Sequence, residues 1–334
     1  MNNEILVSIS CITYNHKPYI RKALDSFLMQ KTKFKYEILI HDDASTDGTQ
    51  EIIKEYVKNY PKIIKPIFES ENQYSKGVKR ITYIFNDKRA KGKYIALCEG
   101  DDFWIDSNKL QKQVDYMEEH EECSMCFHAA EFYDNETKSV TEIRRAYNKD
   151  CIAFSSDIIS KGGDFIITNS MLYKKSALNN PPEFFFNSHV GDYPMQLIFA
   201  IKGTVYYINE TMSAYRIAVK NSWTSNNILN DNKNEKKVIN IANNIKLLTE
   251  FNIYTNNTFF NAVERGLFLL LSVVFTYGDS VVLKDKIFRT AYNSLKISSK
   301  LKLILLYCFP NTSKLIINTK NKIKKDIYYE KQKK

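Results

Sequence analysis

The chain has 334 residues, of which 44% are hydrophobic and 13% aromatic, so it can bury a sizeable core and we expect no wholesale disorder. No apolar run reaches the roughly 20 residues of a membrane-spanning helix, and the first residues lack the basic and apolar regions of a signal peptide. We therefore expect a cytoplasmic protein. The six cysteines lack paired metal-ligand spacing and favour buried thiols over a zinc site.

The net charge of +10 is unevenly distributed along the chain. Residues 284–334 hold 14 of the 48 Lys and Arg but only 3 of the 38 Asp and Glu, which leaves residues 1–283 with a net charge of −1. A nucleic-acid-binding protein favours a basic patch on its main body, so we expect no nucleic acid partner. The basic, partly apolar tail predicts either a contact with an anionic membrane surface or a solvated helical segment.

The first hundred residues alternate between apolar, β-branched runs and segments with helical spacing of apolar residues. This β-α-β-α order predicts a Rossmann-like, mostly parallel sheet with helices on both faces. We expect strands at 5–13, 36–41, 63–69 and 93–99, and helices at 17–30, 45–61 and 77–90.

The pattern changes after residue 104 and becomes mainly helical from about residue 233. A polar, Asn-rich stretch near residue 225 predicts a boundary between an α/β domain, residues 1–225, and a helical, basic region, residues 226–334. Within the first domain we expect a helix at 107–120, a strand at 124–133, a strand then a helix in 165–178, a helix at 191–203 that begins near Asp192, and strands in 204–217.

Polar clusters follow three of the predicted strands: "TYNH" at 13–16, "HDDASTD" at 41–47 and "EGDD" at 99–102. In parallel α/β sheets, ligands bind at the carboxyl ends of the strands, so these clusters predict one binding site. The chain lacks the glycine-rich motifs of dinucleotide and P-loop sites. Carboxylates attract a diphosphate only through a divalent cation, and Mg²⁺ and Mn²⁺ prefer such oxygen ligands.

Five motifs in order resemble those of a family 2 glycosyltransferase with the GT-A fold: "VSISCITYNH", "HDDASTDGT", "GKYIALCEGDDFW", "GDYPMQ" and "AYRIAVKNSW". The resemblance covers roughly residues 4–225. It implies an inverting transfer of a sugar from a nucleoside diphosphate donor, most expected to be a UDP-sugar, to an acceptor hydroxyl on a glycan or lipid-linked sugar. It also implies Mn²⁺ or Mg²⁺ as cofactor. We expect the enzyme to act in the synthesis of a bacterial surface polysaccharide such as a capsule or O-antigen. We also expect it to be a peripheral protein on the inner face of the cell membrane.

The resemblance also implies a role for each matching residue. The general base is Asp192, and the metal ligands are Asp101 and Glu99. The donor nucleotide contacts are Thr13, Tyr14, Asn15, Asp42, Asp43, Arg80 and Asp102, and the diphosphate or acceptor contacts are Arg216, Lys220, Trp223 and Trp104.

Two positions depart from the family pattern, because Glu99 stands where relatives have Asp and Ala218 where many have His. These departures motivate an alternative, a degenerate sugar-nucleotide binder without catalysis. A nucleotidyltransferase is a further alternative, but it favours a basic glycine-rich loop after the first strand, and "TYNHKPY" lacks one. Taken singly, Asp192 and the acids of "DDASTD" also fit helix caps, the two tryptophans fit a core, and His16, His41 and His128 fit hydrogen-bonded structural residues.

Overall fold

The computed structural model describes residues 4–219, 233–276 and 285–308. The chain forms two compact units that divide after Lys233. The domain boundary expected near residue 225 lies outside the described residues.

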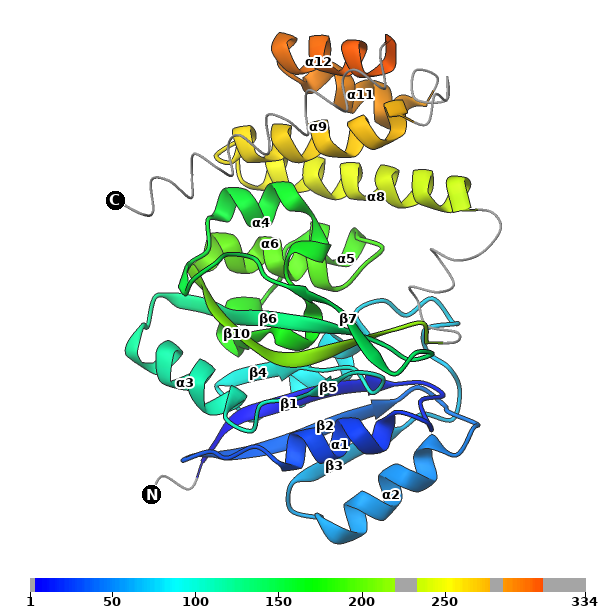
Figure 1. The fold of residues 1–334 in the computed structure, drawn as a ribbon, viewed down its shortest axis with the longest axis vertical. Coiled ribbons are helices and arrows are strands. Elements are labelled where there is room, and N and C mark those ends of the chain that lie inside the picture. Colours follow the sequence, from blue (N-terminus) through cyan, green and yellow to red (C-terminus); the bar gives the residue numbers. More distant parts are fainter. Residues whose placement is uncertain (1–3, 220–232, 277–284, 309–334) are drawn as a thin grey trace. The chain divides into compact units, whose positions relative to one another are not determined.

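The first unit is built on one ten-stranded sheet (Figure 1). Its strands are β1 (Ile5–Thr13), β2 (Lys35–Asp42), β3 (Ile64–Phe68), β4 (Tyr94–Leu97), β5 (Phe103–Trp104), β6 (Cys123–Asp134), β7 (Ser139–Arg144), β8 (Cys151–Ile152), β9 (Leu172–Lys174) and β10 (Thr204–Ile217). The order is β3-β2-β1-β4-β9-β6-β10-β5, with β7 paired to β6 and β8 to β10. The pairs β3-β2, β2-β1, β1-β4 and β6-β10 are parallel, and β9 joins the two parallel parts by antiparallel pairing.

Helices cover the sheet and connect its strands. They are α1 (Ile20–Leu28), α2 (Thr49–Asn59), α3 (Lys109–Glu119), α4 (Ser155–Lys161), α5 (Glu183–Asn187) and α6 (Asp192–Lys202), with the short turns η1 (Thr82–Asn86), η2 (Asp87–Arg89), η3 (Gly163–Phe165), η4 (Thr168–Ser170) and η5 (Lys175–Leu178). Figure 1 shows α1 and α2 alongside β1 to β3. The predicted α/β fold is confirmed.

Strand β1 shows why this sequence forms a central strand. Its apolar side chains belong to the core that also contains Leu24 and Phe27 of α1, and its serines are buried on the opposite face. Each serine has a partner that compensates for its loss of water, since Ser8 donates to Glu37 at 2.7 Å and Ser10 donates to Asp87 at 3.2 Å. Burial on both faces is the environment of a central parallel strand.

The helix expected at 77–90 is the main difference from the prediction. Only η1, a π-helical turn, and η2, a 3₁₀ turn, form there. Arg80 has a φ of 62°, which lies outside the helical region and ends any helix that would begin earlier. In 165–178, where we expect a strand then a helix, the strand β9 forms between the turn η4 and the short 3₁₀ turn η5, and no longer helix follows the strand.

The second unit consists of helices, as the C-terminal helical pattern predicts. They are α8 (Lys233–Tyr254), α9 (Phe260–Thr276), α11 (Lys286–Ser294) and α12 (Ile297–Cys308). Leu248 and Phe251 of α8, Leu271 of α9 and Leu303 of α12 are buried. Of the helices in the described ranges, none combines the length and the hydrophobicity that a membrane span requires.

Candidate active site

The three predicted polar clusters meet at one edge of the sheet. Thr13 and Asp42, the last residues of β1 and β2, are register partners in the parallel ladder. The amide of Gly100 donates to the carbonyl of Ile12 at 2.9 Å, which fixes the turn after β4 against the end of β1. The edge predicted from strand order is therefore present.

Gly100 allows an unusually close approach between two of these clusters. A Cβ atom at this position would lie 2.8 Å from Thr13 Oγ1 and 3.0 Å from His16 Nδ1. Any other residue would push the acidic turn away from the first loop. The glycine of "EGDD" thus sets the spacing between Asp101 and the loop that follows β1.

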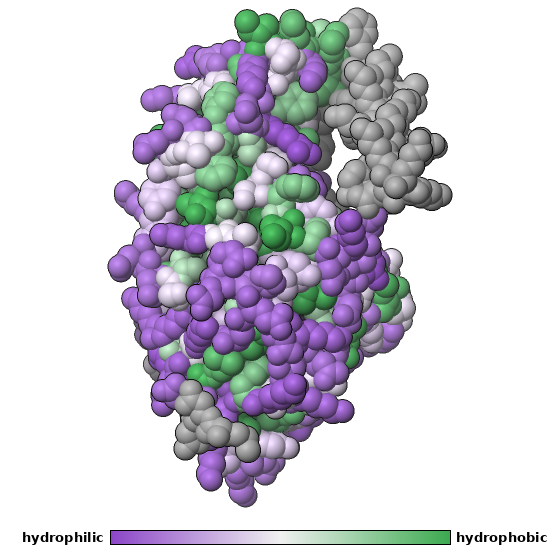
Figure 2. Space-filling model, turned by 90° about the vertical axis from the view of Figure 1, so that its left-hand side faces the viewer, coloured by the Kyte–Doolittle hydropathy of each residue, from purple (hydrophilic) through white to green (hydrophobic). Residues whose placement is uncertain are grey.

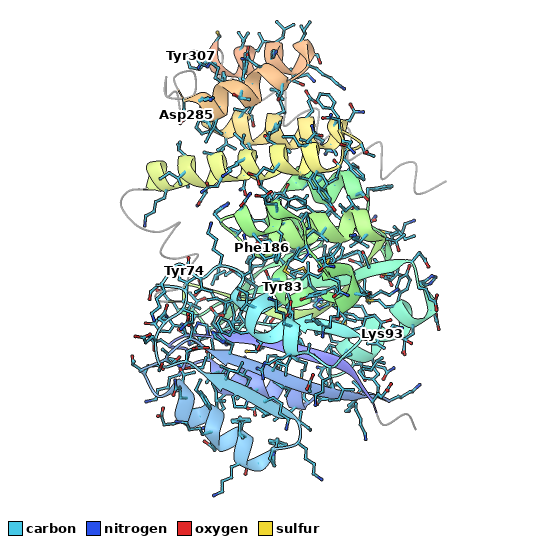
Figure 3. The ribbon with its side chains drawn as sticks, turned by 180° about the vertical axis from the view of Figure 1, so that it is seen from behind. Tyr74, Tyr83, Lys93, Phe186, Asp285 and Tyr307 are labelled. Atoms are coloured by element: carbon cyan, nitrogen blue, oxygen red, sulfur yellow. The ribbon has the colours of Figure 1, made fainter. Side chains whose placement is uncertain are left out.

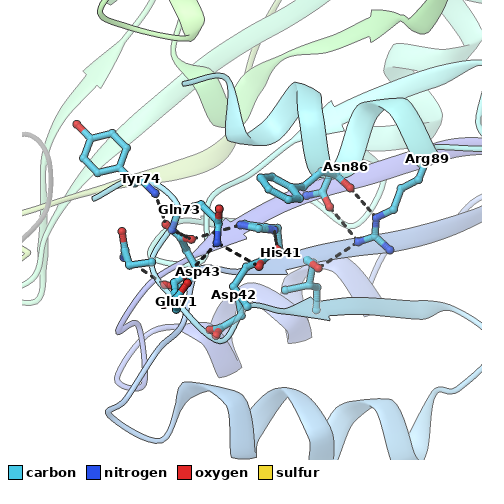
Figure 4. A network of polar contacts seen from close by, with 12 residues as sticks. His41, Asp42, Asp43, Glu71, Gln73, Tyr74, Asn86 and Arg89 are labelled. Atoms are coloured by element: carbon cyan, nitrogen blue, oxygen red, sulfur yellow. Dashed lines mark hydrogen bonds and ion pairs between the residues drawn. The ribbon is translucent and has the colours of Figure 1, made fainter. Parts of the chain in front are cut away.

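Asp42 and Asp43 have different environments, although the sequence treats them alike (Figure 4). Asp42 Oδ1 accepts from the Ser45 amide at 3.0 Å and from Gln50 Nε2 at 2.7 Å. Its Oδ2 is buried and has no hydrogen-bond partner in the described part of the chain. Asp42 therefore keeps one acceptor for a ligand.

Asp43 is instead occupied by the loop that follows β3. Its carboxylate accepts from the backbone amides of Gln73 at 2.7 Å and Tyr74 at 3.1 Å (Figure 4). Behind it, the buried His41 stacks on Phe85 with ring centroids 4.2 Å apart. Both oxygens of Asp43 are used in shaping this loop, so its contribution to a site is positional.

The first loop offers an exposed ring and a buried hydroxyl. The Tyr14 side chain is 47% exposed, whereas Thr13 is buried and its Oγ1 has no partner among the described residues. Asn15, with a φ of 55°, joins this loop to the next: its amide donates to Ser45 Oγ at 2.8 Å and its Oδ1 accepts from Thr46 N at 2.9 Å. Asn15 therefore holds the loop, on which Tyr14 is exposed and Thr13 is buried.

The acids of the turn after β4 separate into distinct roles. Asp102 is buried, and it accepts from the Arg216 amide at 2.7 Å and from Asn169 Nδ2 at 2.9 Å. Burial, with neighbouring Asp101, raises the pKa of Asp102 well above its ordinary value. Asp102 thus fastens the turn to β10 and η4, while Asp101 Oδ1 is buried with no partner in the described ranges.

Glu99 and Asp192 are close enough for their charges to interact. Burial, together with the charges of Asp101 and Asp192, raises the pKa of Glu99 to about 8. Asp192 is the first residue of α6, and its Oδ1 accepts from the Tyr193 amide at 2.7 Å. Burial also raises the pKa of Asp192, which Asp164 reinforces. A carboxyl with a raised pKa is suited to proton transfer near neutral pH.

Arg80 lies close enough to Asp192 for their charges to interact. Its guanidinium donates to the carbonyls of Phe185 and Ser188 and lies 5.2 Å from the centroid of the Phe185 ring. Burial lowers the pKa of Arg80 to about 10, against the opposing charge of Asp192. Tyr83 packs edge-on against Phe186 at 6.2 Å (Figure 3). The arginine therefore fastens α5 to the segment that precedes η1.

Arg216 lies directly beside the acidic turn, at the end of β10. Its Nε donates to the Asp101 carbonyl at 2.6 Å, and its guanidinium lies 4.9 Å from the Tyr19 ring centroid and 5.0 Å from that of Phe103. Trp104, by contrast, is 2% exposed and donates to the Asn169 carbonyl at 3.0 Å, so it belongs to the core. Lys220 and Trp223 lie outside the described residues.

A protein metal site of three or more ligands is absent from the described ranges. No group of three His, Cys, Asp or Glu side chains there could hold an ion. A metal ion that also binds a diphosphate needs fewer protein ligands, because phosphate oxygens and water complete its coordination. Asp101 Oδ1, a buried carboxylate oxygen without a partner, fits such an ion.

A family model described as "Glycosyl transferase family 2" matches residues 8–180, just over half of the chain. The chain belongs to glycosyl transferase family 2. The predicted family and enzyme class are thereby confirmed. The matched range contains the first three polar clusters and stops before Asp192, so it does not include α6 or β10.

Curated relatives match parts of the chain of different length. Uncharacterized protein Rv1520 of Mycobacterium tuberculosis is 37% identical over 223 residues, 66% of this chain and 61% of that protein. The chain thus matches less than two thirds of this relative's length. Bacillus subtilis TuaG, whose name places it in teichuronic acid biosynthesis, is 35% identical over 126 residues, 38% of this chain and 47% of TuaG.

Solved structures of similar shape show the GT-A fold. S. aureus TarS 1–349 in complex with UDP has a TM-score of 0.53 at 15% identity, with 91% of each chain covered. The mannosyltransferase PcManGT from Pyrobaculum calidifontis, in complex with GDP-Man and Mn²⁺, has a TM-score of 0.52 at 15% identity, with 93% of this chain and 89% of that chain covered. At these identities the likeness establishes the fold of this family 2 member.

Two residues of the site were missed by sequence reasoning. Asn169 binds Asp102 and also donates to the Ala214 carbonyl at 3.0 Å, so it joins three segments of the first unit. His16 was expected to be a hydrogen-bonded structural residue, yet its Nδ1 is buried without a partner among the residues described. The position of His16 in the cluster "TYNH" could have indicated a role in the site. No sequence feature indicated such a role for Asn169.

Proposed function

We propose that the chain is an inverting glycosyltransferase that moves a sugar from a nucleoside diphosphate donor, most favoured as a UDP-sugar, to an acceptor hydroxyl. The observation that carries this proposal is a set of buried acceptor atoms with no partner in the described residues, namely Thr13 Oγ1, Asp42 Oδ2 and Asp101 Oδ1, on the edge that faces Asp192. Such atoms cost free energy unless a ligand satisfies them. Family membership supplies the class of ligand.

The donor nucleoside would bind at the ends of β1 and β2. The free Oδ2 of Asp42 can accept from the single ring N–H of uracil, and the exposed ring of Tyr14 can cover the base. Asn15 and Asp43 would act by holding the two loops. TarS, which shares this fold, was solved with UDP and with UDP-GlcNAc, and this agrees with the choice of donor.

The diphosphate would lie over the acidic turn. Asp101 would hold a divalent cation, Mn²⁺ or Mg²⁺, with Glu99 beside it and Asp102 fixing the turn from behind. When bound, the cation neutralises the charge that develops on the departing diphosphate. Arg216, held against the Asp101 carbonyl, is placed to add a second positive charge, and Lys220 and Trp223 follow it in the chain.

Asp192 would act as the general base from the acceptor side. Its carboxylate takes the proton of the acceptor hydroxyl while that oxygen forms a bond to the anomeric carbon. The bond from the anomeric carbon to the diphosphate oxygen breaks on the opposite face, and the nucleoside diphosphate leaves with the electron pair. Attack opposite to the leaving group inverts the configuration, and one base is enough for this step.

Donor hydrolysis tests the proposal. The protein is incubated with UDP- and dTDP-sugars and Mn²⁺, and free nucleoside diphosphate is measured. We expect release that Asp101→Ala and Asp192→Asn abolish, while Glu142→Gln, a change at an exposed carboxylate on β7, leaves it intact. Donor binding without turnover, even with a panel of acceptors, would instead support a degenerate sugar-nucleotide binder.

The acceptor we propose is a growing surface polysaccharide at the inner face of the cell membrane. The likeness to TuaG supports the polymer class. Helix α12 supports the location, because Ile297, Leu301 and Leu305 are 77%, 56% and 53% exposed and Lys300 and Lys302 lie among them. Figure 2 shows hydrophobic side chains gathered at the α11–α12 end of the second unit. Exposed apolar and basic residues on one helix suit an anionic lipid surface.

A further inference from the structure

His16 lies at the first loop, at a position where hydrogen bonds fix its backbone. Its carbonyl accepts from the amides of Tyr19 and Ile20, both at 2.8 Å, where α1 begins. The side chain is 17% exposed, so one edge of the imidazole reaches the site while the rest is enclosed. A partly enclosed imidazole close to a strand end is suited to bind a ligand.

The polar atoms around this ring leave it unsatisfied. His16 Nε2 lies 3.9 Å from Asp101 Oδ2, too far for a hydrogen bond. Nδ1 is buried without a partner in the described ranges, and so are Asp101 Oδ1 and the hydroxyl of the 2% exposed Thr13. Gly100 brings these groups together, because its Cβ position is within 3.0 Å of both Thr13 Oγ1 and His16 Nδ1.

The separation of His16 and Asp101 is close to that of two ligands of one ion. Ligand atoms that each lie about 2.1 Å from a cation are roughly 3 Å apart in adjacent octahedral positions. The 3.9 Å between Nε2 and Oδ2 is wider by about 1 Å, so ion binding would draw the two side chains together. The end of β10 offers no competing imidazole, since position 218 is Ala.

We propose that His16 is the second protein ligand of the divalent cation that Asp101 holds, so that the cation sits between the first loop and the acidic turn. This inference rests on the proposed function, which supplies the diphosphate. An imidazole nitrogen beside a carboxylate suits Mn²⁺ better than Mg²⁺, which prefers oxygen ligands alone. The site therefore selects Mn²⁺ over Mg²⁺.

Electron paramagnetic resonance of Mn²⁺ with the full chain and UDP tests this assignment. Wild type should show nitrogen modulation from one imidazole in the spin-echo spectrum, and His16→Ala should lose it and bind Mn²⁺ at least tenfold more weakly. His16→Gln, which keeps a polar side chain of similar size, should also lose the modulation. Tyr19→Phe, which alters a neighbour of His16 but keeps its ring, should retain the wild-type signal and affinity.

The possible outcomes separate this inference from the proposed function. If Asp101→Ala loses Mn²⁺ while both His16 variants keep wild-type affinity and wild type shows no nitrogen modulation, His16 is not a ligand and the donor site stands. If His16→Ala weakens UDP binding equally with and without Mn²⁺, the imidazole contacts phosphate and the inference is overturned. If UDP does not increase Mn²⁺ binding to wild type, both the inference and the proposed function fail.

Discussion

At the scale of single residues, adjacent acids do different work. Asp101 and Asp102 are neighbours in the sequence, yet Asp102 has both oxygens hydrogen-bonded by the protein, and Asp101 Oδ1 has no described partner. A carboxylate that accepts hydrogen bonds from the protein stabilises the fold, whereas a buried carboxylate oxygen without a hydrogen bond is available to a ligand. The same contrast separates Asp43 from Asp42.

This contrast predicts opposite effects of two alanine substitutions. Asp102→Ala leaves the Arg216 amide and one of the two Asn169 Nδ2 hydrogens unpaired, and should lower stability by about 3 kcal/mol, or roughly 6–12 °C in Tm. Asp101→Ala removes a carboxylate whose buried Oδ1 has no partner in the described ranges, and should leave Tm unchanged or higher. Thermal unfolding of the ligand-free proteins, followed by circular dichroism, measures both.

Ligand binding completes the comparison. With Mn²⁺ and UDP present, wild type should gain several degrees in Tm and Asp101→Ala should gain none. Equal Tm values for the two alanine variants without ligand would contradict the division of roles.

At the scale of elements, helix α3 carries a buried charge that the proposed reaction does not use. Lys109 is fully buried, donates to Gln113 Oε1 at 2.7 Å and lies 4.1 Å from the Trp104 ring centroid. Burial lowers its pKa to about 7. This lysine lies in the core beside Trp104, behind the acidic turn.

The Lys109 pKa predicts a pH dependence of stability. Between about pH 7 and its ordinary value of 10.5, the unfolded chain holds a proton that the folded chain has released, so stability rises with pH in this window. Lys109→Met removes the amine that binds this proton, so this contribution to the pH dependence disappears. The Tm of the variant relative to wild type should be highest below pH 7 and should decline by pH 9. A constant difference from pH 6 to pH 9 would show that Lys109 does not titrate in this way.

The elements that could be predicted from the sequence are those with long, regular apolar patterns. Strands β1 and β2 and helices α1 and α2 lie within about three residues of the expected bounds at either end, apart from the N-terminus of α2. The three clusters at strand ends followed from the parallel order alone. The prediction of a helix at 77–90 was wrong, because the spacing of apolar residues does not reveal the positive φ of Arg80.

The finer division of the site could not be read from the sequence. Asp102 is satisfied by Asn169 and Arg216, which are 67 and 114 residues away along the chain. The approach of His16 to Asp101 depends on the contact of Gly100 with Thr13, which no local pattern encodes. Motif order identified the family, but hydrogen bonds between distant segments decide which carboxylate is free.

At the scale of the whole molecule, the charge division between the two ends of the chain fits the two tasks that we propose. The nearly neutral first 283 residues contain the proposed donor site, and the basic remainder includes α12 with its exposed apolar residues. We expect this end to hold the protein at anionic lipid, close to a lipid-linked acceptor.

Liposome flotation tests the membrane contact. The full chain should float with vesicles that contain anionic lipid and should not float with neutral vesicles. The double change Leu301→Asp and Leu305→Asp should abolish flotation, while Ile253→Asp, at a 68% exposed position of α8, should not. If the double variant floats as well as wild type, α12 does not bind the membrane.

The central claim, an inverting transfer with Asp192 as base, is tested most directly by the configuration of the first product. Proton NMR of donor cleavage can follow the anomeric signal of the released or transferred sugar before it equilibrates. From an α-linked UDP-sugar, the proposed mechanism gives a β product, and Asp192→Asn gives no product. An α product, or full activity in Asp192→Asn, would contradict it.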